Sequence, residues 1–418
     1  MHTSIYHPER DKAMSLPLAQ IDPSKGYLFE HDYVGWYFER LRRDDPVHLS
    51  RSKRFGPYWS VTKYKYIMAV DTDHATYSSD AHLGGIALAE RPAPEVFPSF
   101  IAMDPPRHDE QRRSVSPIVA PANLARLEGT IRERAARILD GLPIGEPFDW
   151  VPRVAIELTT QMLATLFDFP FEDRKLLTWW SDMATGDPDG NGPVTSWEQR
   201  LAELGKCQDY FTQLWNERVN AAPGNDLISM LAHAPATRHM SPQEYLGNVI
   251  LLIVGGNDTT RNSISGGLLA LNRFPAEYDK LRADPALVES MVPEIIRWQT
   301  PLAHMRRTAL RDATLGGKTI RKGDKVVMWY LSGNRDEEAI EQPDAFIIDR
   351  ARPRQHMSFG FGIHRCVGNR LAELQLKVLW QEILRRFPRI EVVGEPKRTK
   401  SNFVHGFTSL PVVIPARH

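Results

Sequence analysis

The chain has 418 residues and a formal net charge of +0, because 52 Lys and Arg are matched by 52 Asp and Glu. A balanced charge provides no overall attraction to nucleic acid or to an anionic membrane, so we expect neither as a partner. The longest apolar run, residues 249–254, is far shorter than the roughly 20 residues of a membrane span. The first residues lack the layout of a signal peptide and the two cysteines cannot form a disulfide framework, which together predict a cytoplasmic protein.

The predicted elements are mainly helices within one domain that covers residues 1–418. Residues 1–25 are interrupted by prolines, and we expect them to be peripheral. Apolar periodicity predicts helices over 123–140, 154–167, 197–219, 241–274, 285–298 and 370–387. Short strands are predicted in GPYWSVT from Gly56, in ATLGGKTIRKGDKVVMWY with a turn at Gly316–Gly317, and in the C-terminal NFVHGFTSLPVVIP. The expected fold class is therefore mainly α with small peripheral β-sheets.

The helix predicted from Ser241 is unusually long. Ser241 and Glu244 have the spacing of a capping box, and no proline interrupts the helix until Pro275. At 1.5 Å per residue this helix would be about 50 Å long and would cross the whole molecule. Its centre, GGNDTT, contains poor helix formers. Either two helices meet at Gly255–Gly256, or one helix is loosened there so that a ligand or water approaches its backbone.

Cys366 lies between a glycine-rich turn and the start of the helix over 370–387. Taken alone it could be an inert core thiol or a redox-active thiol. Its neighbours favour a third interpretation: glycines leave the backbone free to approach a flat group, and the helix N-terminus directs N–H groups towards the sulfur. Both features favour a thiolate. Since no Cys/His cluster has zinc spacing, haem iron with a cysteine axial ligand is the best candidate.

The segment FGFGIHRCVG, residues 359–368, resembles the haem-binding loop of the cytochrome P450 superfamily. The family pattern places Phe, Gly, His, Cys and Gly at the spacing seen here, and Gln375 is a minor departure where Glu is common. The resemblance implies the P450 fold, with its long central helix over the haem, haem b as cofactor and Cys366 as axial thiolate. It also implies that residues around the haem include Gly255, Phe359, Gly360 and Gly368.

The motif EIIR places Glu294 and Arg297 one turn apart on a helix. Alone it is a weak signal, because such pairs are usually exposed and contribute a few tenths of a kcal/mol. The same spacing recurs at Glu39/Arg42, Glu110/Arg113 and Glu382/Arg385. The family resemblance makes Glu294 and Arg297 a structural pair completed by Arg350, behind the cysteine loop. We therefore expect a buried triad in which the loss of one member leaves an uncompensated charge.

The resemblance also assigns residues to the haem propionates and to proton delivery. His108 and Arg112, four residues apart, and also Arg307 and His364, would provide cationic donors to the propionates. Each of these would, taken singly, more often be an ordinary surface residue. Asp258 and Thr259 of GGNDTT correspond to the acid and alcohol that deliver protons beside bound oxygen.

Electrons must come from another protein, because the chain has neither a nucleotide-binding fingerprint nor an iron–sulfur cysteine run. The resemblance implies an iron–sulfur ferredoxin that is reduced by an NAD(P)H ferredoxin reductase. Between residues 350 and 377, six Lys and Arg are balanced only by Glu373. This basic stretch is either a solvated face or a docking surface for an acidic ferredoxin.

The expected substrate is small and hydrophobic. By resemblance the pocket lining is aliphatic and aromatic, although each residue could equally belong to the core: Leu83, Ile86, Leu251, Leu302, Phe403 and Phe407. Several segments, among them GGNDTTRNSISGG and SNFVHGFTSL, are similar to soluble bacterial P450 enzymes that hydroxylate alkanes and fatty acids at the chain end. The alternatives are a hydroxylase of terpenes or other cyclic hydrocarbons, and a haem-thiolate sensor or carrier. Proton-delivering residues argue against a carrier.

Overall fold

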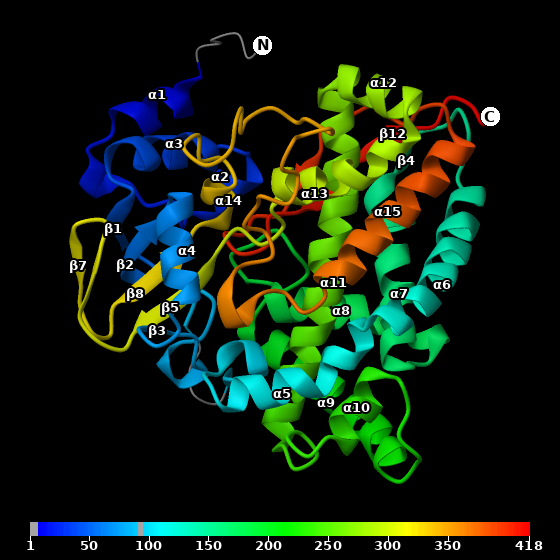
Figure 1. The fold of residues 1–418 in the computed structure, drawn as a ribbon, viewed down its shortest axis with the longest axis horizontal. Coiled ribbons are helices and arrows are strands. Elements are labelled where there is room, and N and C mark those ends of the chain that lie inside the picture. Colours follow the sequence, from blue (N-terminus) through cyan, green and yellow to red (C-terminus); the bar gives the residue numbers. More distant parts are fainter. Residues whose placement is uncertain (1–6, 91–94) are drawn as a thin grey trace.

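The computed structural model describes residues 7–90 and 95–418 and confirms a mainly helical fold with small sheets. Figure 1 shows most helices on one side of the molecule and the strands of the largest sheet on the other. The helices are α1 (Pro8–Ser15), α2 (Gly26–Glu30), α3 (Val34–Asp44), α4 (Tyr64–Thr72), α5 (Arg107–Val115), α6 (Pro121–Asp140), α7 (Glu157–Phe167), α8 (Lys175–Thr185), α9 (Trp197–Val219), α10 (Leu227–His233), α11 (Pro242–Arg273), α12 (Pro275–Ala283), α13 (Val288–Gln299), α14 (Tyr330–Gly333) and α15 (Asn369–Arg386).

The long predicted helix is a single element, α11, so the alternative with two helices meeting at Gly255–Gly256 is wrong. Its N-terminus carries half of the expected capping box. The Ser241 hydroxyl accepts the N–H of Glu244 at 3.2 Å. The Glu244 carboxylate accepts from Arg107 and not from the backbone N–H of Ser241. Residues 262–271 are buried on every side, because α11 packs against α7, α8, α13 and α15. This helix is therefore the axis around which the helical half is built.

Two other predicted helices begin with a different kind of turn. The segment predicted over 154–167 starts with a π-helical stretch, Val151–Ile156, before α7. The segment predicted over 285–298 starts with a 3₁₀ turn, Pro285–Leu287, before α13. Helix α9 has the bounds that its periodicity predicted. Helix α8 was not predicted, although it contributes side chains to the site.

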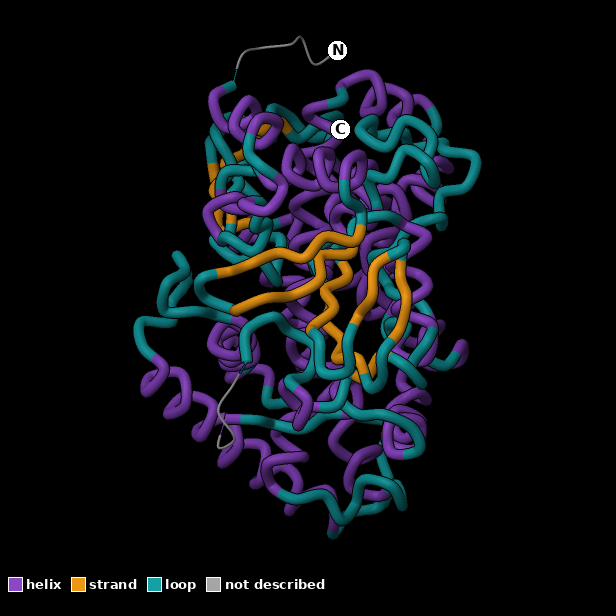
Figure 2. Tube along the Cα trace, turned by 90° about the vertical axis from the view of Figure 1, so that its left-hand side faces the viewer, coloured by secondary structure: helices purple, strands orange, loops and turns teal. Residues whose placement is uncertain are grey.

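The strands form four small sheets. They are β1 (Val47–Ser52), β2 (Gly56–Val61), β3 (Tyr77–Ser78), β4 (Phe148–Asp149), β5 (Met305–Ala309), β6 (Ala313–Leu315), β7 (Lys318–Ile320), β8 (Lys325–Met328), β9 (Glu391–Val392), β10 (Lys397–Arg398), β11 (Phe407–Ser409) and β12 (Pro411–Val413). The largest sheet has the order β1-β2-β8-β5-β3, in which only β2 and β8 are parallel; Figure 2 shows it at the face of the molecule. Gly316 and Gly317 turn the β6–β7 hairpin with φ values of +56° and +76°, as their position in the sequence predicted.

The N-terminal segment is less peripheral than expected. Helix α1 lies at the outside, but residues 21–24 are buried against the largest sheet. The Asp22 carboxylate is held there by two hydroxyl donors, Ser24 at 2.5 Å and Tyr58 at 2.8 Å. No helix within residues 7–90 and 95–418 is both long and apolar enough to cross a bilayer.

Close packing between α11 and α13 depends on glycine. A Cβ added at Gly267 would lie 2.7 Å from the Cδ1 of Ile295, which is fully buried. We expect Gly267→Ala to lower the free energy of unfolding by about 1–3 kcal/mol through overpacking. Gly129 lies in α6, and an added Cβ there would meet no atom within 4 Å. Gly129→Ala should therefore raise the free energy of unfolding by up to about 1 kcal/mol through helix propensity. Urea unfolding measures both, and equal effects would contradict this account.

Candidate active site

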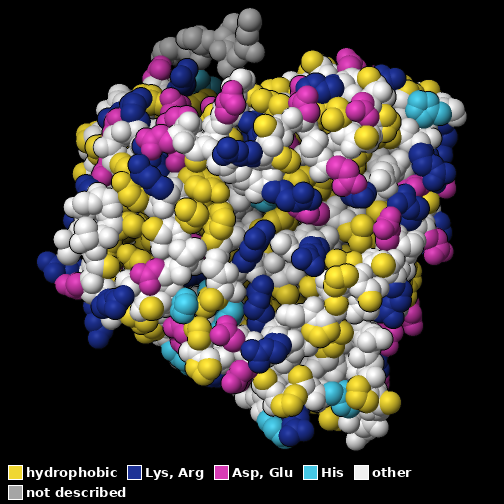
Figure 3. Space-filling view, viewed as in Figure 1, with side chains coloured by type: hydrophobic (Ala, Val, Ile, Leu, Met, Phe, Trp, Pro, Cys, Tyr) yellow, Lys and Arg dark blue, Asp and Glu magenta, His cyan; other side chains and the backbone are white. Residues whose placement is uncertain are grey.

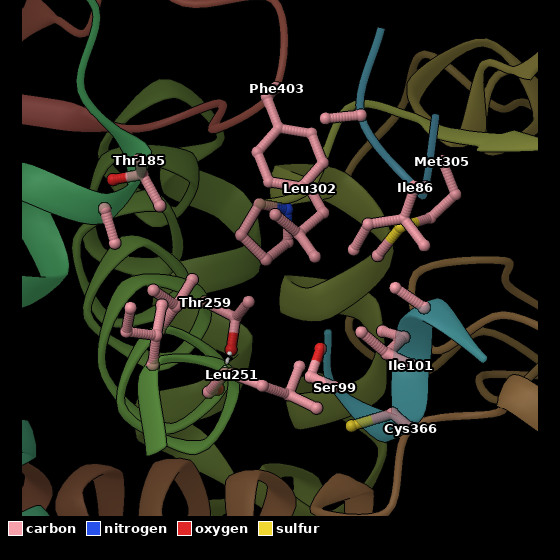
Figure 4. A pocket seen from close by; sticks show the side chains of 18 of the residues that line it. Ile86, Ser99, Ile101, Thr185, Leu251, Thr259, Leu302, Met305, Cys366 and Phe403 are labelled. Atoms are coloured by element: carbon pink, nitrogen blue, oxygen red, sulfur yellow. Dashed lines mark hydrogen bonds between the residues drawn. The ribbon is translucent and has the colours of Figure 1, made fainter. Parts of the chain in front are cut away.

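A cavity of about 650 Å³ lies between α11 and the loop that carries Cys366. Its size is typical of small-molecule and cofactor sites. Figure 4 shows Cys366 and Phe403 at opposite ends of the view, with Thr259 on one side and Ile86 and Ile101 on the other. The side chains come from α8, α11, residues 81–89 and 95–102, the segment before β5, the cysteine loop and the segment 400–403. Segments distant in sequence thus meet around one space.

Cys366 lies at the end of its loop, just before α15, and its sulfur faces the cavity. The backbone N–H of Cys366 donates to the Phe359 carbonyl at 2.8 Å, which closes the loop. Burial raises the pKa of the Cys366 thiol, while the N–H of Gly368 and the positive charges of Arg112 and Arg365 lower it. The net direction is upward. The residue is nevertheless exposed towards the cavity, so a metal ion can reach the sulfur.

The glycines around Cys366 have two different roles. Gly360 and Gly362 have φ values of +66° and +65°, and an added Cβ at Gly362 would lie 2.6 Å from the Asp71 carbonyl oxygen. They let the loop turn tightly against α4. Gly255 and Gly368 instead line the cavity, and a Cβ at either would meet no atom within 4 Å. These two positions leave room for a group that occupies the cavity. Phe359 also lines it.

Asp71 holds the cysteine loop, although nothing in the sequence singled it out. Its buried carboxylate accepts from the Phe361 N–H at 2.7 Å, the Tyr330 hydroxyl at 2.8 Å and the Arg307 guanidinium at 2.9 Å. It thereby joins α4, α14, β5 and the loop. Because each partner lies more than 200 residues from Asp71 in the sequence, no local spacing could have revealed the contact.

The triad expected behind the loop is assembled and buried. The Glu294 carboxylate accepts from Arg297 at 2.7 and 2.8 Å and from Arg350 at 3.1 and 3.2 Å. Arg297 also donates to the Asn334 carbonyl at 2.9 Å. The Asn334 side chain in turn donates to the Ser358 hydroxyl and accepts the N–H of Met357. Through Asn334 the triad is connected to the start of the cysteine loop.

The four residues expected at the propionates lie on one side of the cavity, but not all reach it. Arg112, Arg307 and His364 line it. His108 does not line it and packs behind His364, with ring centroids 4.3 Å apart. Burial and the nearby Arg307 lower the pKa of His364 to about 2, and burial lowers the pKa of His108.

Thr259 and Asp258 point in different directions from α11. Thr259 lines the cavity, and its hydroxyl donates to the Gly255 carbonyl at 2.8 Å. Asp258 is fully buried and does not line the cavity. Its carboxylate pairs with Arg261 at 2.8 Å and accepts from Ser181 and Thr185, both at 3.2 Å. Adjacent helical positions differ by about 100° in direction, which explains why Asp258 lies away from the cavity that Thr259 lines.

The sequence missed the group that links Asp258 to the cavity. Thr185 of α8 lines the cavity and also contacts the Asp258 carboxylate. Burial raises the pKa of Asp258, and the Arg261 charge partly offsets this rise. The carboxyl group is thus able to hold a proton at a higher pH than an exposed aspartate. Arg261 also pairs with Asp182 of α8 at 2.7 Å, so a charged cluster connects α8 with α11.

Four of the six residues expected to contact substrate line the cavity: Ile86, Leu251, Leu302 and Phe403. The other two do not. The Leu83 side chain is 42% exposed, because its carbonyl is held by Arg306 and Thr308 and the side chain turns outward. Phe407 lies in β11 and packs into the helical core, with the Arg398 guanidinium over its ring. Ser99, Ile101 and Met305 line the cavity but were not predicted.

The residues present fit a haem. Cys366 lines the cavity, and a cysteine thiolate is a ligand that haem iron takes from a protein. The buried Nδ1 of His364 has no hydrogen-bond partner among the described residues, and Arg112 and Arg307 lie on the same cavity wall. These are the donors that a propionate carboxylate requires. Gly255 and Gly368 provide open space on opposite walls.

Glu294 neutralises two buried arginines, which makes it the sharpest stability test of the site. We expect Glu294→Gln to lower the free energy of unfolding by about 3–5 kcal/mol, because Arg297 and Arg350 lose their counter-charge. The matched control is Glu110→Gln. Glu110 has the same sequence spacing to an arginine but is exposed, so this variant should change the free energy of unfolding by less than about 0.5 kcal/mol. Urea unfolding measures both variants. Equal unfolding midpoints for the two variants would contradict a buried triad.

Comparison with known proteins identifies the family. A model described as Cytochrome P450 matches residues 208–413. Linalool 8-monooxygenase of Pseudomonas putida is 36% identical over 90% of this chain and 94% of its own length. Methyl-branched lipid omega-hydroxylase of Mycobacterium tuberculosis is 33% identical over 95% of each chain. The solved structure of cytochrome P450-153 from Novosphingobium aromaticivorans is 46% identical, covers 94% of this chain and 99% of its own, and superposes with a TM-score of 0.88. The chain therefore belongs to the cytochrome P450 monooxygenase family, and its cofactor is haem b.

Proposed function

We propose that this monooxygenase hydroxylates the terminal carbon of a medium-chain alkane or fatty acid. The overall reaction is RH + O₂ + 2e⁻ + 2H⁺ → ROH + H₂O. The observation that carries the proposal is the apolar wall formed by Ile86, Leu251, Leu302, Met305 and Phe403, across the cavity from Cys366. Such a wall orients a ligand by shape. The similarity to a lipid omega-hydroxylase and to cytochrome P450-153 supports a linear substrate.

The far end of the cavity supports a long substrate. Ser24, Lys25, Arg54 and Lys400 also line it, on segments distant from the cysteine loop. The Arg54 guanidinium pairs with Asp187 at 2.6 Å and Asp189 at 3.3 Å, in the loop between α8 and α9. The cavity thus changes from apolar near Thr259 to charged at its other end. A chain with its methyl group near Thr259 would leave its other end beside these polar groups.

When bound, haem b supplies the iron at which O₂ is activated. Cys366 would hold that iron through its sulfur, and Arg112, Arg307 and His364 would hold the propionates. The Thr259 hydroxyl, already donating to the Gly255 carbonyl, has lone pairs free to accept a hydrogen bond from water in the cavity. It is therefore suited to position a proton donor beside the reacting oxygen.

Asp258 would supply protons from outside the cavity. Its buried carboxyl touches Thr185, and the Thr185 hydroxyl reaches the cavity wall. A proton held at Asp258 would pass to the Thr185 hydroxyl and then to cavity water next to Thr259. This indirect route keeps the carboxylate out of the apolar space. It also limits the access of bulk water to the substrate.

The electron donor is proposed to be a ferredoxin reduced by an NAD(P)H ferredoxin reductase. A second depression lies beside Cys366 and shares Arg112 with the main cavity; it also contains Arg354, Arg365 and Arg370 with one acid, Glu373. Figure 3 shows Lys and Arg side chains in a line down this face. An acidic protein would be attracted to such a surface, with an on-rate that falls as salt rises.

A second candidate function is the hydroxylation of a terpene. The observation that favours it is the 36% identity to linalool 8-monooxygenase over most of both chains. The catalytic residues would be the same, and only the shape of the apolar wall would differ. A missing or additional methylene in such a wall changes binding by only about 1–3 kcal/mol, so both classes deserve direct measurement.

Ligand titration of the haem-loaded protein separates the two candidates. We expect n-octane and octanoic acid to displace iron-bound water and shift the Soret band from low to high spin, with limonene much less effective. The product from octanoic acid should carry its hydroxyl at the terminal carbon, as measured by gas chromatography with mass detection. A shift with limonene alone would reject the linear-chain assignment and keep the monooxygenase.

Thr259→Ala tests the proton-delivery role. We expect product per O₂ consumed to fall several-fold, with the difference recovered as hydrogen peroxide, because water near the reacting oxygen is no longer positioned. Thr212→Ala is the matched control: its hydroxyl makes the same bond to the carbonyl four residues earlier, on the exposed side of α9. An unchanged product yield in Thr259→Ala would refute the role.

A further inference from the structure

The cavity wall is formed by a segment that lies between two loops. Residues 301–306 run from the end of α13 into β5. On one side the Ala303 N–H donates to the Phe403 carbonyl at 2.9 Å. On the other side the Arg306 N–H donates to the Ile86 carbonyl at 2.7 Å. The segments 83–90 and 400–405, distant in sequence, are thus both held by the same short stretch.

One side chain in this stretch bonds to both loops. His304 is fully buried. Its Nε2 accepts the N–H of Leu88 at 3.2 Å, and its Nδ1 lies 2.8 Å from the Asn402 carbonyl oxygen. A carbonyl only accepts and an amide N–H only donates. The ring must therefore carry one proton, on Nδ1, and it fills both roles only when neutral.

The surroundings of His304 stabilise that state. Burial and the positive charge of Arg306 lower the pKa of His304 to about 4, against the raising effect of the Asn402 carbonyl. The ring also packs edge-on to Trp329 and Phe403, with centroids 4.9 and 5.4 Å away. Rotation of the ring would break both hydrogen bonds and both packing contacts. It is consequently held in one orientation.

The two loops that His304 joins carry side chains on the substrate wall. Ile86 and Leu88 line the cavity from one loop, and Asn402 and Phe403 line it from the other. Figure 4 shows Ile86 and Phe403 facing the cavity with Leu302 between them. The distance between these walls determines which ligand shapes fit, and His304 connects them from behind.

We propose that His304 is a positioning residue that sets the width of the substrate cavity, and through it the carbon atom that is hydroxylated, by tying Leu88 to Asn402. The effect of His304 on the products rests on the proposed function. The tie between the loops does not depend on that function. His304 itself does not line the cavity.

Two substitutions each preserve one of the bonds. In His304→Asn the side-chain amide takes the place of Nδ1 and still donates to Asn402, while Leu88 loses its acceptor. In His304→Gln the side-chain carbonyl takes the place of Nε2 and still accepts from Leu88, while the bond to Asn402 is lost. His405→Asn is the control, because His405 is also buried and bonds through Nδ1 to the Gln299 carbonyl at 2.6 Å, but does not contact segment 83–90.

Hydrogen exchange on the haem-loaded variants tests the tie directly. In His304→Asn we expect one amide of the peptide containing 83–90 to exchange roughly tenfold faster, the change expected for a lost hydrogen bond. His304→Gln and His405→Asn should leave that amide unchanged. Unchanged exchange in His304→Asn would overturn the proposal, whatever the enzyme hydroxylates.

Ligand preference and product position test the consequence. Both His304 variants should increase the affinity for limonene relative to octane in the spin-shift titration, and should move part of the hydroxylation of octanoic acid away from the terminal carbon. His405→Asn should change neither. Faster exchange with unaltered ligand preference would also overturn the proposal. If the wild-type protein hydroxylates no linear chain, the proposed function fails, while the exchange and affinity measurements still decide the role of His304.

Discussion

The Cys366 sulfur must reach the cavity wall at the place where it can hold the haem iron. The rest of the site depends on this constraint. The loop must bring the sulfur to the cavity wall without a side chain in the way, and glycines at 360, 362 and 368 meet that need. The loop must also be held there before the cofactor arrives. Asp71 does so from α4, and Asn334 does so from the end of α14.

Buried carboxylates paired with arginine recur at the junctions of the fold. Glu294 joins α13 to the segment that carries Arg350, and Asp71 joins α4 to β5. Asp258 pairs with Arg261 of its own helix, and Arg261 joins α11 to α8 through Asp182. A buried ion pair contributes little net stability, but removing one partner is costly. A pair between two elements therefore penalises arrangements in which those elements are apart. Arg307, the partner of Asp71, lines the cavity itself.

The chemistry and the selectivity of the enzyme come from different parts of the chain. Cys366 lies on the cysteine loop, just before α15, and Thr259 lies on α11, the central helix of the core. The substrate wall comes instead from loops, the segments 83–90 and 400–405, joined through residues 301–306. Loops vary without disturbing a core. A neutral histidine between two such loops keeps the substrate wall that they form in one shape.

Features that depend on neighbouring residues could be predicted from the sequence. The loop around Cys366, the bounds of α9 and the β6–β7 turn follow from local spacing, helix periodicity and glycine geometry. For α11 the sequence left one helix or two open, and the structure has one. Together with the family resemblance, these were sufficient for the fold class and the cofactor. They also placed Glu294 and Arg297 one helical turn apart.

Where side chains point, and which distant residues meet, depends on how the elements pack. Leu83 turns outward and Phe407 enters the core, although the resemblance suggested that both line the pocket, and Asp258 turns into the α8 interface. Asp71 and His304 were not predicted at all, because their partners lie more than a hundred residues away along the chain or belong to the backbone. Hydrogen bonds of this kind depend on angles and distances that arise only when the elements pack. A sequence motif records residue types and spacing, and does not contain that geometry.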